Sequence, residues 1–409
     1  MKSAEKSGMI IPETIIIKVW VILGLIVNFP GICHAQTDTA SPKLFSRLQE
    51  KGFTFGINET LEGYYNFTGG KRTGSAIAST FDVNMNTDLE KLTGLPGATL
   101  YMDLEDHAGN NPTDKLIGDL QVFDKHNAAP FLQILEIWYQ QILFNQKLRV
   151  KIGKIDANSE FSVIDNGLDF INSSTQVTPT FFVFPTFPDP VPAINIFFTP
   201  DKLFYTSFAI DDANQNARFL DFYGDPVSVQ PTRNGVLLLS ESGLTWDKLP
   251  IFGKDGNLKI GLWKHTGTFS KFNAKNQQGA GGFYLIANQT LWKPAAQNNG
   301  SRGIRMFIEY TATDSTVSSV YEHFGSGVIW TGPSADHPKD ATGFSAHYAA
   351  LSPGLDLPDN DELNMEAFYK LQITSRMNIK PDIQYIIHPG GRYKNAFIGT
   401  LLLNFSFNP

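Results

Sequence analysis

One stretch of the chain alternates polar and apolar side chains, and its polar members could bind a hydroxyl-rich solute. Glu136, Trp138 and Gln140 occupy alternate positions there. A carboxylate and an amide exchange hydrogen bonds with hydroxyl groups, and an indole face can stack on the apolar face of a sugar ring. Arg149 and Lys151 follow in the next alternating stretch. If the two stretches are neighbouring antiparallel strands, a cation lies close to Glu136 or Gln140.

The same alternation runs through most of the chain and predicts β-strands. In the first stretch Leu135, Ile137 and Tyr139 take the face opposite the polar residues. A period of two over about ten residues, broken by turn residues, is typical of strands that span a membrane with apolar side chains outward. About sixteen such segments are expected: 53–66, 75–88, 97–107, 132–145, 147–156, 192–199, 202–211, 234–246, 257–269, 281–293, 303–314, 322–332, 343–351, 362–374, 378–388 and 395–407.

An even number of two-faced strands favours an all-β fold, a transmembrane antiparallel β-barrel, over a soluble all-β protein. A sandwich needs an apolar face only toward its core, whereas here the apolar face persists from strand to strand. Aromatic residues also gather near the predicted strand ends, where barrels carry aromatic girdles. They are Tyr64, Tyr65, Phe67, Phe269, Phe272, Trp292, Trp330, Phe405 and Phe407.

The N-terminal part of the chain does not alternate. Residues 1–35 combine early lysines, a short apolar run and small residues before Ala35, which predicts a signal peptide cleaved near Ala35. The single cysteine falls inside it. Residues 36–52 are expected to form a periplasmic segment with a short helix over 41–51, and residues 53–409 the barrel domain.

Residues 157–191 interrupt the strand pattern with Asn, Ser, Pro and Phe. Connections of this length are usually functional. We expect this loop to fold into the lumen as a constriction, and the alternative is a loop exposed at the cell surface. The first candidates for side chains that line this constriction are Glu136, Trp138, Gln140, Arg149 and Lys151. The alternative is that Trp138 belongs to an aromatic girdle and that the charged residues only hydrate the wall of the lumen.

Composition excludes several functions. The formal net charge is −7 and no basic run occurs, which argues against nucleic acid as a partner. No nucleophile elbow, phosphate-binding loop or paired catalytic carboxylates are found. The histidines are scattered along the chain without ligand spacing, so neither a metal site nor a cofactor is expected.

Six stretches of the sequence resemble segments of a known protein family. They are Leu44–Gly56 (LFSRLQEKGFTFG), Asp88–Leu100 (DLEKLTGLPGATL), Ile152–Phe161 (IGKIDANSEF), Asn166–Ser174 (NGLDFINSS), Phe184–Pro190 (FPTFPDP) and Ile379–Gly391 (IKPDIQYIIHPGG). In this order they resemble the OprB-type carbohydrate-selective porins, although His388 stands where that family more often has Asn. The resemblance implies a sixteen-stranded outer-membrane porin that passes glucose and related sugars through a narrow charged eyelet.

Charged residues on the predicted polar faces are expected to line the lumen, because charge facing lipid is costly. These further candidates are Asp103, Glu105, Lys259, Trp263, His265, Arg305, Glu309, Glu366, Lys370, Lys380 and Asp382. The expected partners are small sugars and the lipids and lipopolysaccharide of a Gram-negative outer membrane, and the barrel is expected to work as a monomer or a homotrimer. The alternatives are a general diffusion porin, an outer-membrane enzyme and an exported sugar-binding protein.

Overall fold

The computed structural model describes residues 40–213, 221–224, 235–248, 254–273, 275–294 and 302–408. The predicted signal peptide, residues 1–35, lies outside this range. The strands are β1 Phe53–Gly70, β2 Gly74–Asp88, β3 Ala98–Gly109, β4 Phe131–Leu143, β5 Leu148–Ile155, β6 Val191–Phe198, β7 Phe204–Asp212, β8 Asp221–Gly224, β9 Val236–Trp246, β10 Gly256–Ser270, β11 Asn276–Trp292, β12 Gly303–Thr313, β13 Val320–Thr331, β14 Ala341–Leu351, β15 Asp361–Thr374, β16 Met377–Ile387 and β17 Lys394–Phe407.

The strands close into a barrel. Each pairs antiparallel with its neighbours, and β1 pairs with both β2 and β17, so the wall has no free edge. Strand β7 pairs directly with β9, while the short β8, as far as the chain is described, pairs with the start of β4. Leaving β8 aside, the 17-stranded sheet has sixteen wall strands, which confirms the predicted count and positions. A closed sheet satisfies its own backbone hydrogen bonds, as a bilayer requires.

Alternation decides which side chains face the lumen. On β10, Lys259, Trp263 and His265 are buried, whereas Ile260 and Leu262 on the other face are 53% and 61% exposed. Other strands repeat this pattern, so that large apolar side chains cover the outside of the wall. None of the helices in the described residues is long and apolar enough to cross a bilayer.

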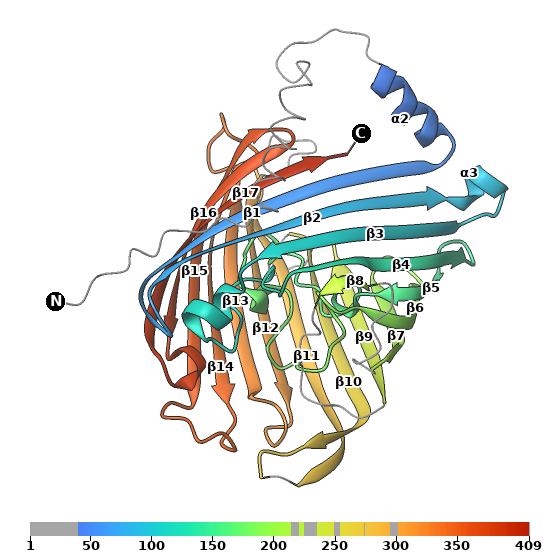
Figure 1. Ribbon diagram of the computed structural model, residues 1–409. Coiled ribbons are helices and arrows are strands. Elements are labelled where there is room, and N and C mark those ends of the chain that lie inside the picture. The colour runs from blue at the N-terminus through green and yellow to red at the C-terminus, as the bar shows by residue number, and fades with distance from the viewer. Residues whose placement is uncertain are drawn as a thin grey trace.

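The helices are short and lie at the ends of the wall or inside it. They are α2 Ala40–Glu50, α3 Leu89–Thr93, the π-helical turn η2 Thr113–Ile117, and the 3₁₀ turns η3 Ala157–Ser159, η4 Ser173–Thr175 and η5 Pro389–Gly391. Helix α2 confirms the helix predicted over 41–51. It packs near the end of the wall where the C-terminus lies, because Phe45 contacts Phe55 and Phe407 at ring distances of 6.4 and 6.1 Å (Figure 1).

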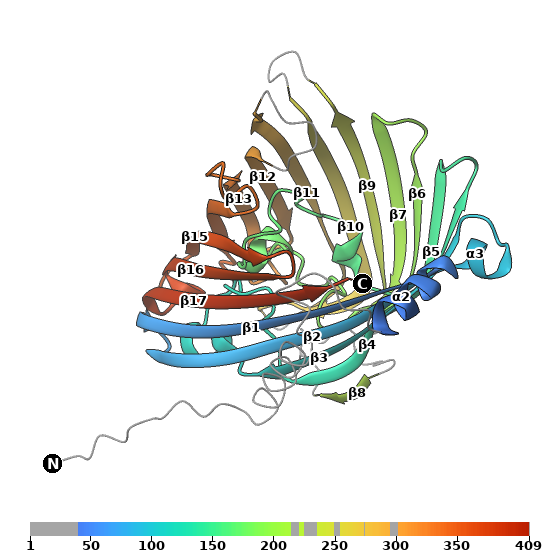
Figure 2. The same cartoon turned by 90° about the horizontal axis from the view of Figure 1, so that it is seen from above.

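Two long connections fold into the barrel from the end remote from α2. We call residues 110–130, between β3 and β4, the first inner segment, and residues 156–190, between β5 and β6, the second inner segment. Both occupy the interior of the wall in the view from above (Figure 2). The second confirms the expected inward loop over the surface-exposed alternative. The first was not predicted.

The second inner segment carries the apolar core of the molecule. Phe170 lies edge-on to Phe307 and Phe368 of the wall at 5.9 and 5.0 Å, and Phe184 lies edge-on to Trp263 at 6.0 Å. This packing buries apolar area that would otherwise face a water-filled lumen. Buried aromatic side chains therefore pack the segment against the wall.

Three facing predictions were wrong. Tyr64 and Phe269, expected in the aromatic girdle, are 2% exposed and face inward, where Tyr64 donates a hydrogen bond to Glu62 and Phe269 packs against Phe182. Leu135, expected outward, is buried because a β-bulge between Asp103 and Leu104 shifts the register of β4 at this residue. Tyr65, Phe67, Trp292 and Trp330 are exposed, as a girdle requires.

Candidate functional site

A cluster of charged side chains gathers on the lumen face of β5. The guanidinium of Arg149 donates from Nη1 to Oε1 of Glu160 over 2.9 Å and from Nη2 to Oε2 over 2.5 Å. The ammonium of Lys151 donates to the same carboxylate. A bidentate Arg–carboxylate pair fixes both partners in one orientation. Two cations thus hold one anion, and we call Gln140, Arg149, Lys151 and Glu160 the lumen cluster.

The local sequence places these groups together. Arg149 and Lys151 are two residues apart on β5 and so share a face. Just past this strand, Asp156 caps the turn η3 by accepting a hydrogen bond from the backbone N–H of Asn158 over 2.7 Å. This turn reverses the chain, and Glu160 comes back over the strand that precedes it.

Gln140 joins the cluster from the neighbouring strand β4. Its Oε1 accepts a hydrogen bond from Nη1 of Arg149 over 3.2 Å. The register pairs Gln140 with Lys151, so the amide and the two cations line adjacent strands on one face. The expectation that a cation approaches Gln140 is therefore confirmed.

The indole ring of Trp138 is covered by neighbouring side chains and does not lie open to the lumen. Tyr101 of β3 stacks on the indole at 4.8 Å, and Nζ of Lys151 on β5 lies 3.9 Å from the indole ring centre. Because β3 and β5 flank β4 on opposite sides, these groups cover the two faces of the ring. Gly153 allows the close approach, since a Cβ there would lie 2.5 Å from Cα of Trp138. Trp138 therefore orients Lys151 and offers no open face for stacking.

Glu136 lies beside the cluster without joining it. Its carboxylate accepts a hydrogen bond from the backbone N–H of Asp156 over 2.9 Å. Of the two expected neighbours of the cations, Gln140 therefore contacts Arg149, while Arg149 and Lys151 form their ion pairs with Glu160 of the second inner segment. The role of Glu136 is to hold the start of that segment against β4.

The charge balance of the cluster depends on the ionised form of Glu160. Burial by itself raises the pKa of this carboxyl, but the hydrogen bonds from Arg149 and the charge of Lys151 outweigh burial and leave the pKa below its ordinary value of 4.5. With two cations and one carboxylate, the cluster carries a net positive charge. Arg149 is 28% exposed, whereas Lys151 and Glu160 are each 7% exposed, so the guanidinium is the charged group most open to the lumen.

Comparison with known proteins identifies the family and the fold of the chain. The family model described as carbohydrate-selective porin, OprB family, matches residues 72–407. The chain belongs to the OprB family. It is 22% identical to Porin B of Pseudomonas aeruginosa in an alignment that covers 88% of this chain and 89% of that protein.

Two solved structures show the same fold. The structure of Pseudomonas putida OprB at high pH matches with a TM-score of 0.75 at 18% identity, covering 88% of this chain and 96% of that one. The structure of the same protein at low pH matches with a TM-score of 0.59 at 16% identity, covering 90% of this chain and 96% of that one. Family and fold indicate a channel of the Gram-negative outer membrane rather than an enzyme.

Several of the other candidates in this OprB-family barrel face the lumen and hold its inner segments. Nζ of Lys259 donates to the backbone carbonyl of Val163 over 2.7 Å, and Nζ of Lys380 donates to that of Asp169 over 2.8 Å. Lys370 pairs with the Asp169 carboxylate. The carboxylate of Glu366 accepts hydrogen bonds from two backbone N–H groups of the second inner segment. These four residues serve as anchors in this structure.

The remaining candidates are spread around the wall and are not members of the lumen cluster. Asp103 and Glu105 are buried on β3, and Asp382 is buried on β16. His265 accepts a hydrogen bond from the backbone N–H of Gly267, and Arg305 reaches Thr331 over 3.4 Å. Glu309 lies close to His323 and His347.

Sequence reasoning missed Glu160, the central carboxylate. It lies in a stretch without strand periodicity, and nothing in its spacing indicates that the chain turns back there. It also missed an aromatic cavity of about 320 Å³ near the end remote from α2. The lining of this cavity includes Phe181, Phe182, Phe184, Phe187, Pro188 and Val320. The density of Phe and Pro in residues 179–190 was the available signal.

Proposed function

We propose that the protein is a passive channel for small glucose-like mono- and oligosaccharides. The observation that carries the proposal is the lumen cluster, in which Arg149 and Gln140 present donors and an acceptor toward a lumen narrowed by the second inner segment. A sugar that sheds water at a narrowing must exchange its hydrogen bonds for others. The guanidinium, which Glu160 holds in a fixed orientation, and the amide that accepts a hydrogen bond from it can supply them.

Weak binding suits transport. The guanidinium of Arg149 already donates hydrogen bonds to Glu160 and Gln140. A sugar hydroxyl that passes therefore meets a guanidinium whose hydrogen-bonding capacity is partly used. A tight site would trap the solute, whereas conduction requires that it leave as readily as it enters.

The aromatic cavity of the second inner segment supports the same proposal. Apolar faces of a pyranose can pack against Phe182 or Phe187, which are both partly exposed in the cavity lining. We propose that a sugar first meets this aromatic surface and then the lumen cluster. In this proposal, phenylalanines of the second inner segment stack on the sugar in place of Trp138.

Liposome swelling separates this proposal from a general diffusion porin. We expect proteoliposomes to admit glucose faster than neutral non-sugars of similar size, and Arg149→Gln to reduce that preference. Arg305→Gln, which removes an arginine from the lumen wall outside the cluster, is the matched control and should keep it. Equal permeation of sugars and non-sugars through the wild type would instead favour a channel that selects by size and charge alone.

We also propose that residues 1–35 are removed on export and that α2 lies on the periplasmic side. The support is the lysine-rich start, the short apolar run and the small residues before Ala35. Mass spectrometry of the protein from outer membranes tests the first part. A mature chain that still contains Cys33 would contradict it.

A further inference from the structure

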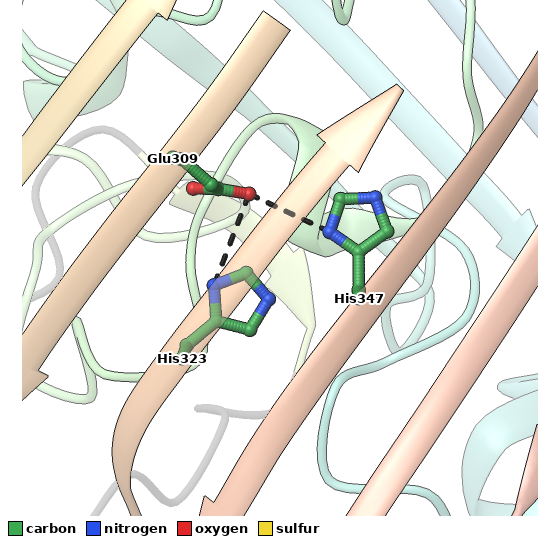
Figure 3. Close-up of side chains that lie close together, drawn as sticks. All are labelled: Glu309, His323 and His347. Atoms are coloured by element: carbon green, nitrogen blue, oxygen red, sulfur yellow. Dashed lines mark ion pairs between the residues drawn. The ribbon is translucent and has the colours of Figure 1, made fainter. Parts of the chain in front are cut away.

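Three residues far apart in the sequence meet inside the barrel wall. Glu309 of β12, His323 of β13 and His347 of β14 come from three neighbouring strands, and their side chains point toward one another (Figure 3). Oε1 of Glu309 lies 3.5 Å from Nδ1 of His347 and 3.8 Å from Nδ1 of His323. One ligand atom from each residue lies within 4.8 Å of the other two.

These polar groups are buried and poorly satisfied by the protein. Glu309 is 1% exposed and both histidines are 0% exposed. Within the part of the chain that the structure describes, neither oxygen of Glu309 and neither ring nitrogen of His347 has a hydrogen-bonding partner. Burying such groups without partners costs free energy, so an arrangement of this kind indicates that another species satisfies them.

Glycine makes room at the centre of the group. Gly325 lies on β13 opposite Glu309 on one side and His347 on the other. A Cβ atom on Gly325 would lie 2.4 Å from Oε1 of Glu309 and 2.6 Å from Nδ1 of His347. Any other residue would therefore occupy space within about bonding distance of two ligand atoms, since zinc binds these atom types at about 2.0–2.2 Å.

We propose that Glu309, His323 and His347 form a binding site for a zinc-type divalent transition metal. Two imidazoles and one carboxylate are a common ligand set for such ions. Tetrahedral ligands at zinc distances lie about 3.3–3.6 Å apart, and Oε1 of Glu309 is close to this spacing from the two histidines, at 3.5 and 3.8 Å. Sugar recognition by the lumen cluster does not depend on this site.

The second inner segment closes the remaining side of the site. The hydroxyl of Thr178 lies 3.2 Å from Nδ1 of His323 and 2.8 Å from the hydroxyl of Thr311. A metal held by β12, β13 and β14 would thus sit beside the segment, and Thr178 or a water would complete the coordination. The bound ion would stabilise the contact between segment and wall, because a ligand that binds only the folded state stabilises it.

Equilibrium dialysis of the tag-free protein in detergent against Zn²⁺, followed by elemental analysis, tests the proposal. We expect about one Zn²⁺ per wild-type chain. Glu309→Gln and His347→Gln should weaken binding at least by the roughly 10- to 100-fold that losing a supporting group costs. Gly325→Ala, which keeps every ligand and fills the space between them, should weaken it as well. His265→Gln removes a buried lumen histidine outside the group and should not.

Co²⁺ provides an independent readout, because its visible absorption reports the ligand geometry. Tetrahedral absorption in the wild type that is lost in Glu309→Gln supports the assignment. The migration of unboiled samples on a gel shows which variants fold. If Gly325→Ala does not fold, the near-isosteric variant Glu309→Gln decides the test. A wild type that holds no Zn²⁺, with water alone satisfying the group, would overturn the proposal, as would equal binding by the wild type and Glu309→Gln.

Discussion

Glu160 determines the electrostatics of the lumen cluster. It neutralises one of two cations and orients the guanidinium of Arg149 through two hydrogen bonds. Without this carboxylate, the repulsion between Arg149 and Lys151 would not be compensated, and Lys151 would keep its contact with the indole of Trp138. A single residue therefore fixes both the charge and the geometry of the narrowing.

Glu160→Gln should make the channel more selective for anions. The substitution adds one positive charge to the cluster at neutral pH, and charge rings at a narrowing determine ion selectivity. Reversal potentials in a KCl gradient measure this directly. The matched control is Glu90→Gln in α3, outside the lumen, which should leave the reversal potential unchanged. A Glu160→Gln channel with wild-type selectivity would place the narrowing elsewhere.

The pH dependence follows from the lowered pKa of Glu160. A carboxyl whose folded-state pKa lies below 4.5 contributes its ion-pair stability above about pH 4.5 and loses it as pH falls through the lower value. We expect an acid-induced shift toward anion selectivity below pH 4.5 that is larger in the wild type than in Glu160→Gln. Identical acid shifts in the two proteins would show that other carboxyls control the pore.

Residue types indicated part of the candidate site. The alternation around Trp138 and Arg149 identified the correct face of two neighbouring strands. The missing part, Glu160, depends on a turn capped by Asp156 and on contacts between distant segments. Similarly, the scattered histidines gave no sign of a cluster, because only the strand register brings His323 and His347 beside Glu309.

At the scale of elements, strand β15 holds both inner segments with two carboxylates. Glu362 accepts hydrogen bonds from the backbone N–H groups of Leu120 and Gln121, each over 2.9 Å. Glu366, four residues on and on the same face, accepts those of Ile171 and Asn172 over 2.7 and 2.9 Å. The segments also bond to each other, since the backbone N–H of Lys125 donates to the carbonyl of Ile171 over 2.7 Å.

Glu366→Gln should loosen the second inner segment. An amide can accept only one of the two hydrogen bonds well, and a hydrogen bond to a charged group is worth about 1.5–3 kcal/mol. We expect a larger and noisier single-channel conductance, with the barrel still folded. The control is Glu322→Gln, which alters a carboxylate of β13 that accepts a hydrogen bond from Tyr310 of β12 rather than from an inner segment. An unchanged conductance would mean that apolar packing alone holds the segment.

The wall strands could be predicted from the sequence, but the inner segments could not be placed. A strand repeats its environment every two residues, so its pattern survives in the sequence. The first inner segment is buried by specific bonds to Glu362 and Gln384 that lie more than two hundred residues away in the chain. Length was the only local sign that residues 110–130 were more than a turn.

At the scale of the molecule, two surfaces with opposite demands share each strand. The outside carries residues such as Leu262, which is 61% exposed, and the inside carries buried charged residues such as Lys259 and Glu366. The inner segments convert a wide cylinder into a narrowed path, with the aromatic cavity toward one end of the barrel. The stability of the barrel therefore depends on burial of its apolar outer surface in lipid.

A charge on the outer surface should destabilise the barrel according to its depth. Leu262→Lys lies near the middle of β10 and should cost about 2–4 kcal/mol, whereas Leu244→Lys lies near the end of β9 and should cost about 0–1 kcal/mol. Urea titrations of folding into lipid vesicles measure both. Equal costs at the two positions would contradict the proposed membrane-spanning band.

Single-channel conductance in planar bilayers, with glucose titrated into the bath, tests the central claim most directly. We predict that glucose reduces the wild-type current in a saturable way, and that Arg149→Gln shifts the half-blocking concentration several-fold upward while Arg305→Gln leaves it unchanged. A current that is insensitive to glucose, or equally sensitive in Arg149→Gln and the wild type, would contradict sugar recognition at the lumen cluster.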